Sequence, residues 1–297
     1  MNSEPIERLE GAFRFKRFTI RQQRSAMKVG TDGVLLGAWA GVRSTDRRIL
    51  DIGTGTGLIA VMLAQRAAEA EITGVDIDDV TEARENGDAS PWGDRLHFVQ
   101  QPIQQFRPAE RYDLIVSNPP FYVDALVCPD LGRTTARHTV HLSYEELLDA
   151  VVRLLSPGGR FAVVLPTPEA ERFRRLAARH LRLDRLTTVR TTPRRPVKRV
   201  LMEFSLISAP ATGAPDLPAG LPADLPAAVP DLPAAVPAVP AGLPTAAVST
   251  ASAAPAGAAV PVTVSGPQID SLTIGTGAHE TYTPEYRALT RDFYLKF

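Results

Sequence analysis

Apolar runs and amphipathic stretches alternate along the first two thirds of the chain. Short apolar runs, typical of buried strands, occur at residues 49–52, 71–76, 96–101, 113–117, 160–166 and 198–207. Stretches with helical periodicity or helix-start signals occur at residues 30–40, 58–67, 81–89, 143–155 and 167–181. This alternation predicts an α/β fold with a doubly wound, mainly parallel sheet. A ligand binds such a sheet at the carboxyl ends of its strands.

Both ends of the chain add to this pattern. Residues 13–28 interleave Phe and Ile with Arg and Lys, which predicts a strand or extended arm with one charged face. That face either contacts phosphates or protects a solvated edge strand. The helix at 30–40 is expected to be capped by Thr31 or Asp32. Residues 268–274 have strand character, and the aromatic tail that follows predicts a packed helix.

Residues 209–267 differ in kind from the rest. They hold 13 of the chain's 26 prolines, no aromatic residue, no Lys or Arg, and three copies of DLPA. Such a segment cannot bury enough surface to offset its ordering entropy. We therefore expect one folded domain, residues 1–208 plus 268–297, interrupted by a low-complexity, disordered insertion at 209–267 that is dispensable for catalysis.

Composition excludes several classes of protein. The formal net charge is zero, but three acids and no base lie in 209–267, so the remainder is mildly basic. The single Cys128 excludes an intramolecular disulfide and a cysteine-only metal site. No apolar run reaches the length of a membrane span, and the N-terminus lacks a signal-peptide apolar core. We expect a cytoplasmic, monomeric protein with no membrane contact and no metal.

The first strand–helix junction has the sequence DIGTGTG. Gly53, Gly55 and Gly57 allow the backbone to approach a ligand closely, and the helix N-terminus favours a negative group. A dinucleotide fingerprint would need Gly where this chain has Leu58. Asp76 ends the next strand, where a carboxylate can accept both hydroxyls of a ribose. The alternative for this residue is a simple helix cap.

The strand at 113–117 is followed by Asn118, Pro119, Pro120 and Phe121. The prolines have no amide hydrogen to donate, so they end the strand in a rigid ledge. The Asn118 side-chain oxygen and the Pro119 carbonyl can each accept one N–H of an exocyclic amine. The ring of Phe121 can stack on a flat base. The alternative is a strand that merely stops at two prolines.

Residues 172–199 are rich in Arg, and Asp184 is the single acidic residue among them. A solvated helix face explains part of this excess. The cluster RRPVKR, with Arg194, Arg195, Lys198 and Arg199, is expected in a loop, where it favours RNA phosphates.

The motifs DIGTGTG, VDID and NPPF, in this order, resemble those of class I S-adenosylmethionine-dependent methyltransferases that act on planar amines. The stretches FRFKRFTIRQQRSAMKVGTDGVLLGAWA and YTPEYRALTRDFYLKF resemble the bacterial valine-tRNA adenine-N6 methyltransferases, which modify the adenosine 3′ of the anticodon, position 37. The resemblance covers nearly all of the chain except 209–267. It implies a Rossmann-like sheet of seven strands whose final hairpin is antiparallel, with the insertion joining strands 198–207 and 268–274.

The resemblance also implies S-adenosylmethionine as cofactor and tRNA as partner. Asp51 and the three glycines would hold the methionine part of the cofactor. Asp76 would bind the cofactor's ribose, and Ile77 would lie against the cofactor's adenine. The remaining expected cofactor-binding residues are Lys28, Thr31, Asp32, Gln101, Ile103 and Asn118. The family commonly has an acid where this chain has Pro102, and Gln101 could substitute for it. His138 and His141 are interpreted as structural.

The expected catalytic residues are Asn118, Pro119 and Phe121. Two acceptors on the adenine amine localise its lone pair towards the methyl group. The sulfonium is already an activated donor, so no metal is needed. Pro120 and Phe121 would bind the substrate, together with the Arg and Lys side chains of RRPVKR. Three alternatives remain open: a guanine-N2 methyltransferase of ribosomal RNA, a glutamine-N5 methyltransferase of release factors, and a non-catalytic RNA-binding protein with a vestigial cofactor pocket.

Overall fold

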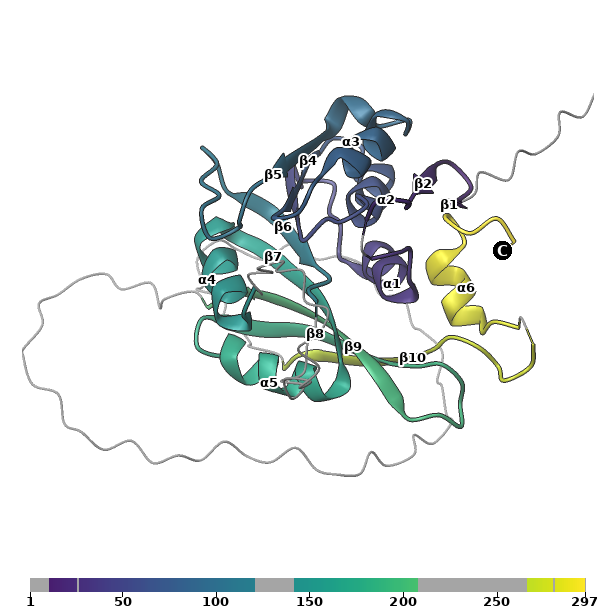
Figure 1. The fold of residues 1–297 in the computed structure, drawn as a ribbon. Helices are drawn as coiled ribbons and strands as arrows, with labels where there is room; N and C mark the ends of the chain where they lie inside the picture. The colour runs from purple at the N-terminus through teal and green to yellow at the C-terminus, as the bar shows by residue number, and fades with distance from the viewer. Residues whose placement is uncertain (1–10, 26, 121–141, 208–265, 280, 297) are drawn as a thin grey trace, which may run out of the picture. The chain divides into compact units, whose positions relative to one another are not determined.

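The computed structural model describes residues 11–25, 27–120, 142–207, 266–279 and 281–296, the coloured parts of Figure 1. All of them lie in one of the chain's two units, residues 1–208 with 266–297. The expectations for Phe121, Cys128, His138 and His141, and for nearly all of the insertion, lie outside the described residues.

The elements follow the predicted alternation closely. The strands are β1 (Ala12–Arg14), β2 (Thr19–Arg21), β3 (Arg48–Ile52), β4 (Glu71–Asp76), β5 (Leu96–Gln100), β6 (Tyr112–Ser117), β7 (Leu155–Pro166), β8 (Leu181–Arg190), β9 (Val197–Leu206) and β10 (Gln268–Thr273). The helices are α1 (Thr31–Trp39), α2 (Leu58–Arg66), α3 (Thr81–Asp88), α4 (Tyr144–Leu154), α5 (Thr167–Ala177) and α6 (Pro284–Thr290), with a short 3₁₀ helix at Gly93–Arg95.

One mixed sheet carries the fold, in the order β10-β8-β9-β7-β6-β3-β4-β5. The strands from β7 to β5 in this order pair in parallel. β9 runs antiparallel to both β7 and β8. The expected α/β class, with a mainly parallel sheet and an antiparallel hairpin, is therefore confirmed (Figure 1).

Two details of the sheet differ from expectation. The described part has eight strands in this sheet and not seven, because residues 181–190 form β8 where a helix end and a basic helix face were expected. The antiparallel hairpin is β8–β9, so the expectation that 198–207 and 268–274 pair with each other was wrong. β10 instead adds to the outer side of β8, in parallel.

Alternating side chains of the central strands feed two cores, one on each face of the sheet. From β6, Leu114 and Val116 pack in the core that includes α1 and α2, whereas Ile115 packs in the core that includes α4 and α5. Figure 1 shows α1–α3 and α4–α5 on opposite faces. The sheet is therefore covered on both faces. The β3–α2 and β4–α3 junctions and the residues after β6 lie together at the carboxyl ends of the strands.

The termini of the helices were only partly predictable. Ser143 and Glu146 form the expected capping box at the start of α4. At α1 the cap is Gly30, which makes no side-chain hydrogen bond, so neither Thr31 nor Asp32 caps that helix. Asp32 instead turns towards β9, as described below.

The N-terminal arm forms a separate two-stranded hairpin, β1–β2. Its Phe15 and Ile20 are buried in the core beside α1 and α2. Its bases, including Lys16 and Arg17, are exposed. The prediction of an extended arm with one charged face is therefore confirmed.

Candidate active site

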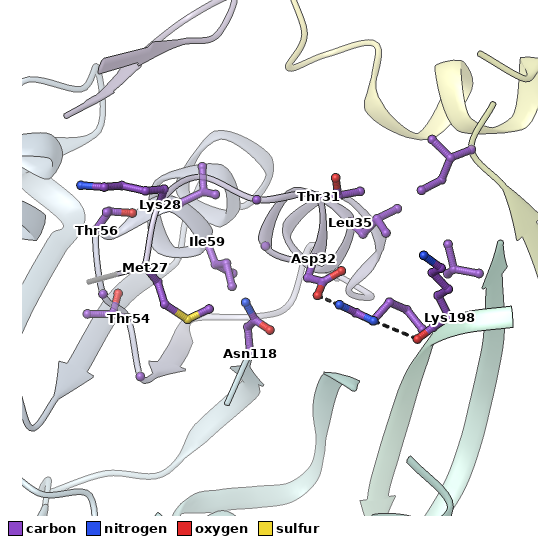
Figure 2. Close-up of a pocket in the computed structure, with 18 of the residues that line it drawn as sticks. Met27, Lys28, Thr31, Asp32, Leu35, Thr54, Thr56, Ile59, Asn118 and Lys198 are labelled. Carbon is purple, nitrogen blue, oxygen red and sulfur yellow. Dashed lines mark hydrogen bonds and ion pairs between the residues drawn. The ribbon is translucent and has the colours of Figure 1, made fainter. Parts of the chain in front are cut away.

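A cavity of about 360 Å³ opens at the carboxyl ends of β3 and β6, a size common for small-molecule sites. Figure 2 shows its walls, which come from the N-terminal arm, α1, the glycine loop and β9. The residues that line it are Met27, Lys28, Gly30, Thr31, Asp32, Gly33, Leu35, Gly53, Thr54, Gly55, Thr56, Leu58, Ile59, Asn118, Val189, Thr191, Lys198, Arg199 and Ile274.

The glycine loop between β3 and α2 leaves open space in front of its backbone. Gly53 and Gly55 have positive φ angles of 74° and 53°, and a Cβ on either would meet no atom within 4 Å. Gly57, the cap of α2, also has positive φ, and a Cβ there would press on the Phe98 ring at 3.1 Å. The loop therefore offers exposed backbone and a helix N-terminus to a ligand.

Asp51 lies beneath this loop and not in the cavity wall. It is fully buried, and its Oδ2 accepts a hydrogen bond from the Thr54 hydroxyl at 2.8 Å. Its Oδ1 has no partner among the described residues. Burial raises the pKa of Asp51 to about 7, although the Thr54 hydroxyl opposes the shift. Its visible role is to fix the loop.

Asp76, at the end of β4, also holds the loop. One carboxylate oxygen accepts the Gly55 amide at 2.8 Å, and the other accepts the Asp78 amide at 3.1 Å. Burial raises the pKa of Asp76, and the hydrogen bonds from Gly55 and Asp78 oppose that shift. Each carboxylate oxygen has a second acceptor position, so the carboxylate retains capacity for a diol. Asp76 itself does not line the cavity.

The other adenine-side residues expected from the sequence are also absent from the cavity lining. Ile77 is 42% exposed on the surface after β4. The backbone amide of Gln101 donates to the backbone carbonyl of Asp76 at 2.7 Å, which ties the loop after β5 to the end of β4. Ile103, also expected to bind the cofactor, is buried in the core beside α4 and α5.

Asn118 brings an unused acceptor to the cavity. It follows β6 directly, where the Ser117 hydroxyl donates to the Ile52 carbonyl at 2.9 Å and fixes the strand end beside β3. The side-chain oxygen of Asn118 is buried and has no hydrogen-bond partner among the described residues. A buried acceptor without a donor is costly, so it indicates a site for a donor group. Pro119 is buried and Pro120 is exposed.

The wall formed by residues 27–32 is held in place from α3. The Asn86 side chain bonds to both the amide and the carbonyl of Arg21, at 2.8 and 2.9 Å. The Glu82 carboxylate accepts the amides of Gln23, Arg24 and Ser25 at 2.6–3.0 Å. These bonds position the arm just before Met27 and Lys28 reach the cavity.

The role of Glu82 and Asn86 was not predicted, because the pattern at 81–89 indicated only a helix. Their signal is present: both are polar residues on the buried side of α3, next to Ala83. Only long-range contacts reveal why a carboxylate is buried there.

An ion pair spans the opposite side of the cavity. The Arg199 Nε lies 2.6 Å from the Asp32 Oδ2, which links α1 to β9 (Figure 2). Asp32 was expected to bind a cofactor and Arg199 to bind RNA; the two side chains pair with each other, and both line the cavity. Lys198 also lines the cavity. Arg194 and Arg195 do not, since both are exposed in the turn between β8 and β9.

Metal-binding clusters and membrane-spanning helices are both absent from the described residues. No group of three or more His, Cys, Asp or Glu side chains there could hold a metal ion. Every helix of the described residues is too short or too polar to span a bilayer.

Comparison with known proteins identifies close relatives. Residues 33–172 match the family model described as methyltransferase small domain. A tRNA1(Val) (adenine(37)-N6)-methyltransferase from Bacteroides thetaiotaomicron is 48% identical over 197 residues, covering 65% of this chain and 83% of the relative. A protein of the same name from Flavobacterium johnsoniae is 37% identical over 289 residues, covering 96% of this chain and 99% of the relative.

A solved structure shares the fold. It is that of a predicted O-methyltransferase, Atu636 from Agrobacterium tumefaciens, with a TM-score of 0.53 and 14% identity. The match covers 88% of this chain and 96% of that one. At this identity the likeness concerns the fold alone.

Proposed function

Because the chain belongs to the family of tRNA1(Val) (adenine(37)-N6)-methyltransferases, we propose that it transfers a methyl group from S-adenosylmethionine to the N6 amine of adenosine 37 in a valine tRNA. The observation that carries this proposal at the level of the site is the buried side-chain oxygen of Asn118, which has no hydrogen-bond partner among the described residues, in a residue that lines a cavity walled by the glycine loop. An exocyclic amine is the kind of donor that this oxygen lacks.

The residues at the cavity fit S-adenosylmethionine. The space in front of Gly53 and Gly55 admits a group that touches the backbone, and the N-terminus of α2 favours a carboxylate there. Lys28 and Thr31, across the cavity, can complete the contacts to the charged amino-acid part. Asp76, which holds Gly55, can accept the ribose hydroxyls on the outer side of the loop.

The mechanism depends on acceptors and positioning. The sulfonium of the cofactor supplies an already activated methyl group. The Asn118 side-chain oxygen and the Pro119 carbonyl accept the two hydrogens of the adenine amine, so that its lone pair is directed away from the ring and towards the methyl group. Ser117 holds the end of β6 against β3, which fixes where Asn118 presents its oxygen. The target base must leave its stack to reach these acceptors.

The tRNA would extend beyond the cavity over basic side chains. Lys198 lines the cavity, and Arg194 and Arg195 are exposed in the adjoining turn. Such Lys and Arg side chains contact phosphates without regard to the nucleotide sequence. They therefore add affinity for tRNA, whereas the pocket adds selectivity for the target nucleotide. We propose that the protein acts in the cytoplasm. We also propose that it acts as a monomer, because one chain supplies all the residues that the proposal uses.

Methyl transfer from isotope-labelled S-adenosylmethionine to bulk bacterial tRNA, followed by nucleoside digestion, tests the proposal. Label in N6-methyladenosine is the expected result. Label in N2-methylguanosine would retain the cofactor and overturn the acceptor. Absence of label in tRNA, with cofactor binding shown separately, would overturn the proposed substrate and direct the assay to ribosomal RNA and release factors.

A further inference from the structure

A second cleft lies at the end of α2 that is remote from the glycine loop. It measures about 550 Å³ and is lined by Lys16, Arg17, Gln65, Arg66, Arg291 and Asp292. Three segments far apart in sequence form it: the turn of the β1–β2 hairpin, the end of α2 and the chain after α6. Four of its six lining side chains are cationic and one is acidic. We call it the cationic cleft.

Hydrogen bonds hold the three segments in register. The Lys16 amide donates to the Phe293 carbonyl at 2.8 Å, and the Lys16 ammonium group donates to the Arg291 carbonyl. The Gln65 side chain donates to the Asp292 carbonyl at 3.0 Å. The cations are therefore presented by a fixed frame that the fold assembles from both ends of the chain.

Two of the arginines are also individually oriented. The Arg17 guanidinium lies over the Trp92 ring, 5.0 Å from its centroid. The Arg66 Nη1 donates to the Gly37 carbonyl at 2.8 Å. Burial, and then the charge of Arg185, lower the pKa of Arg66, so this cation lies in surroundings that an added anion would relieve. Planar guanidinium groups suit phosphate in particular, because they can donate two parallel hydrogen bonds.

The cleft is connected to the active site by the chain itself. The segment from Lys16 to Lys28 begins in the cleft and ends in the wall of the cavity. Arg21 and Arg24 lie between them with exposed side chains. The nine residues of α2 separate the two sites by about 12 Å, at 1.5 Å per residue. A polyanion with one end in the cavity could therefore reach the cleft along this basic arm.

We propose that the cationic cleft binds the sugar–phosphate backbone of the tRNA outside the anticodon loop while the target adenosine occupies the cavity. This inference rests on the proposed function, since it takes tRNA as the substrate. It adds a second contact surface, on the α1–α2 face of the sheet, that the motifs of the active site do not include. The cleft would fix the orientation of the tRNA and would carry no sequence preference.

The test is the double variant Arg17→Gln/Arg291→Gln, compared with Arg175→Gln/Arg179→Gln. The control removes two exposed arginines from α5 and the turn after it, on the opposite face of the sheet. Affinity for a full-length valine tRNA transcript and for an isolated anticodon-loop oligonucleotide is measured at several salt concentrations. Cofactor binding and circular dichroism establish that each variant is folded.

The cleft variant should bind the full tRNA about tenfold more weakly, with a salt slope lower by about one unit for each phosphate that the variant no longer neutralises. Its KM for tRNA should rise with kcat nearly unchanged, and its affinity for the oligonucleotide should stay the same. Equal losses in the control variant, equal losses for both RNAs, or no loss at all would overturn the proposal. Because binding and methyl transfer are measured separately, wild-type protein that binds tRNA but labels no adenosine would count against the proposed function alone.

Discussion

The carboxylate of Glu82 shows how one residue away from the cavity can determine its shape. It is 2% exposed, yet it is satisfied by three consecutive backbone amides of the N-terminal arm. Although burial by itself would raise it, hydrogen bonds from the Ser25 side chain and from the amides of Arg24, Ser25 and Gln23 bring the pKa of Glu82 down to about 2. The arm is thus held by a charge that exists at neutral pH.

Glu82→Gln should lower the free energy of unfolding by about 3 kcal/mol at pH 7, since a neutral amide cannot replace an anion that accepts three amides. A depressed carboxyl pKa stabilises the fold above the unfolded pKa near 4.5, and this contribution disappears as the pH falls towards 2. Urea unfolding of wild type and variant between pH 7 and pH 3 measures the difference. A gap that does not narrow with acidification would contradict this explanation. As a control, Glu85→Gln, whose partly exposed carboxylate pairs with the Arg24 side chain, should cost far less.

The pair of Asp32 and Arg199 is the second residue-scale feature. Both side chains are less than one third exposed, so their interaction is partly shielded from water. In a double-mutant cycle with Asp32→Asn and Arg199→Gln, we expect a coupling of about 1 kcal/mol in urea unfolding. The more exposed pair of Glu171 and Arg174 on α5 is the control, with an expected coupling of about 0.3 kcal/mol. Additive effects of Asp32→Asn and Arg199→Gln would show that the pair does not link α1 to β9.

At the scale of elements, the sequence predicted those whose pattern is local. The apolar run of β6, the glycine junction before α2 and the capping box of α4 depend on near neighbours, and all three are found as expected. β8 was missed because a β-bulge between Leu183 and Arg185 breaks its alternation and its many bases suggested a helix face. β9 follows β8 directly in the chain as the second strand of a hairpin, whereas β10 is distant in sequence, so the pairing of β10 with β8 could not be read from local periodicity.

Gly55→Ala tests the glycine loop as an element. The φ of 53° costs an alanine about 1 kcal/mol in the fold, and the added methyl group would project into open space in front of the loop. We expect affinity for S-adenosylmethionine to fall at least about tenfold, measured by calorimetry, because that space is where the cofactor approaches the backbone.

Gly158→Ala is the matched control for this change. Gly158 has a φ of 78° and equally open space, but it lies at the start of β7. Its alanine variant should lose similar stability and keep its cofactor affinity. Equal affinity losses in both variants, or none in Gly55→Ala, would rule out the loop as the cofactor cradle.

At the scale of the whole molecule, the strand registers explain how a long segment can be inserted between β9 and β10. Leu206, at the end of β9, is opposite Leu181, and Gln268, at the start of β10, is opposite Arg185. Two strand spacings and four residues of rise separate these ends by about 16 Å. Composition predicts the bounds of the segment, but it does not show that β10 pairs with β8, because that register depends on contacts between distant residues.

Replacement of residues 209–265 by an eight-residue Gly/Ser linker should therefore preserve the fold, since such a linker can extend to about 26 Å. We expect the unfolding midpoint to be retained and kcat for tRNA methylation to stay within about twofold, in line with the expectation that the segment is dispensable for catalysis. Circular dichroism and the labelling assay measure both. An intact spectrum with lost activity would show that the segment takes part in catalysis.

The central claim is that the side-chain oxygen of Asn118, which has no partner in the described part of the chain, accepts a hydrogen bond from the amine of the target adenine. The most direct test is Asn118→Ala, with cofactor affinity measured by calorimetry and single-turnover methyl transfer to a valine tRNA transcript measured by labelling. Removal of a positioned acceptor should lower the transfer rate by at least about a hundredfold while S-adenosylmethionine still binds. A variant that transfers methyl groups at the wild-type rate, or that fails because it no longer binds the cofactor, would contradict the role given to Asn118.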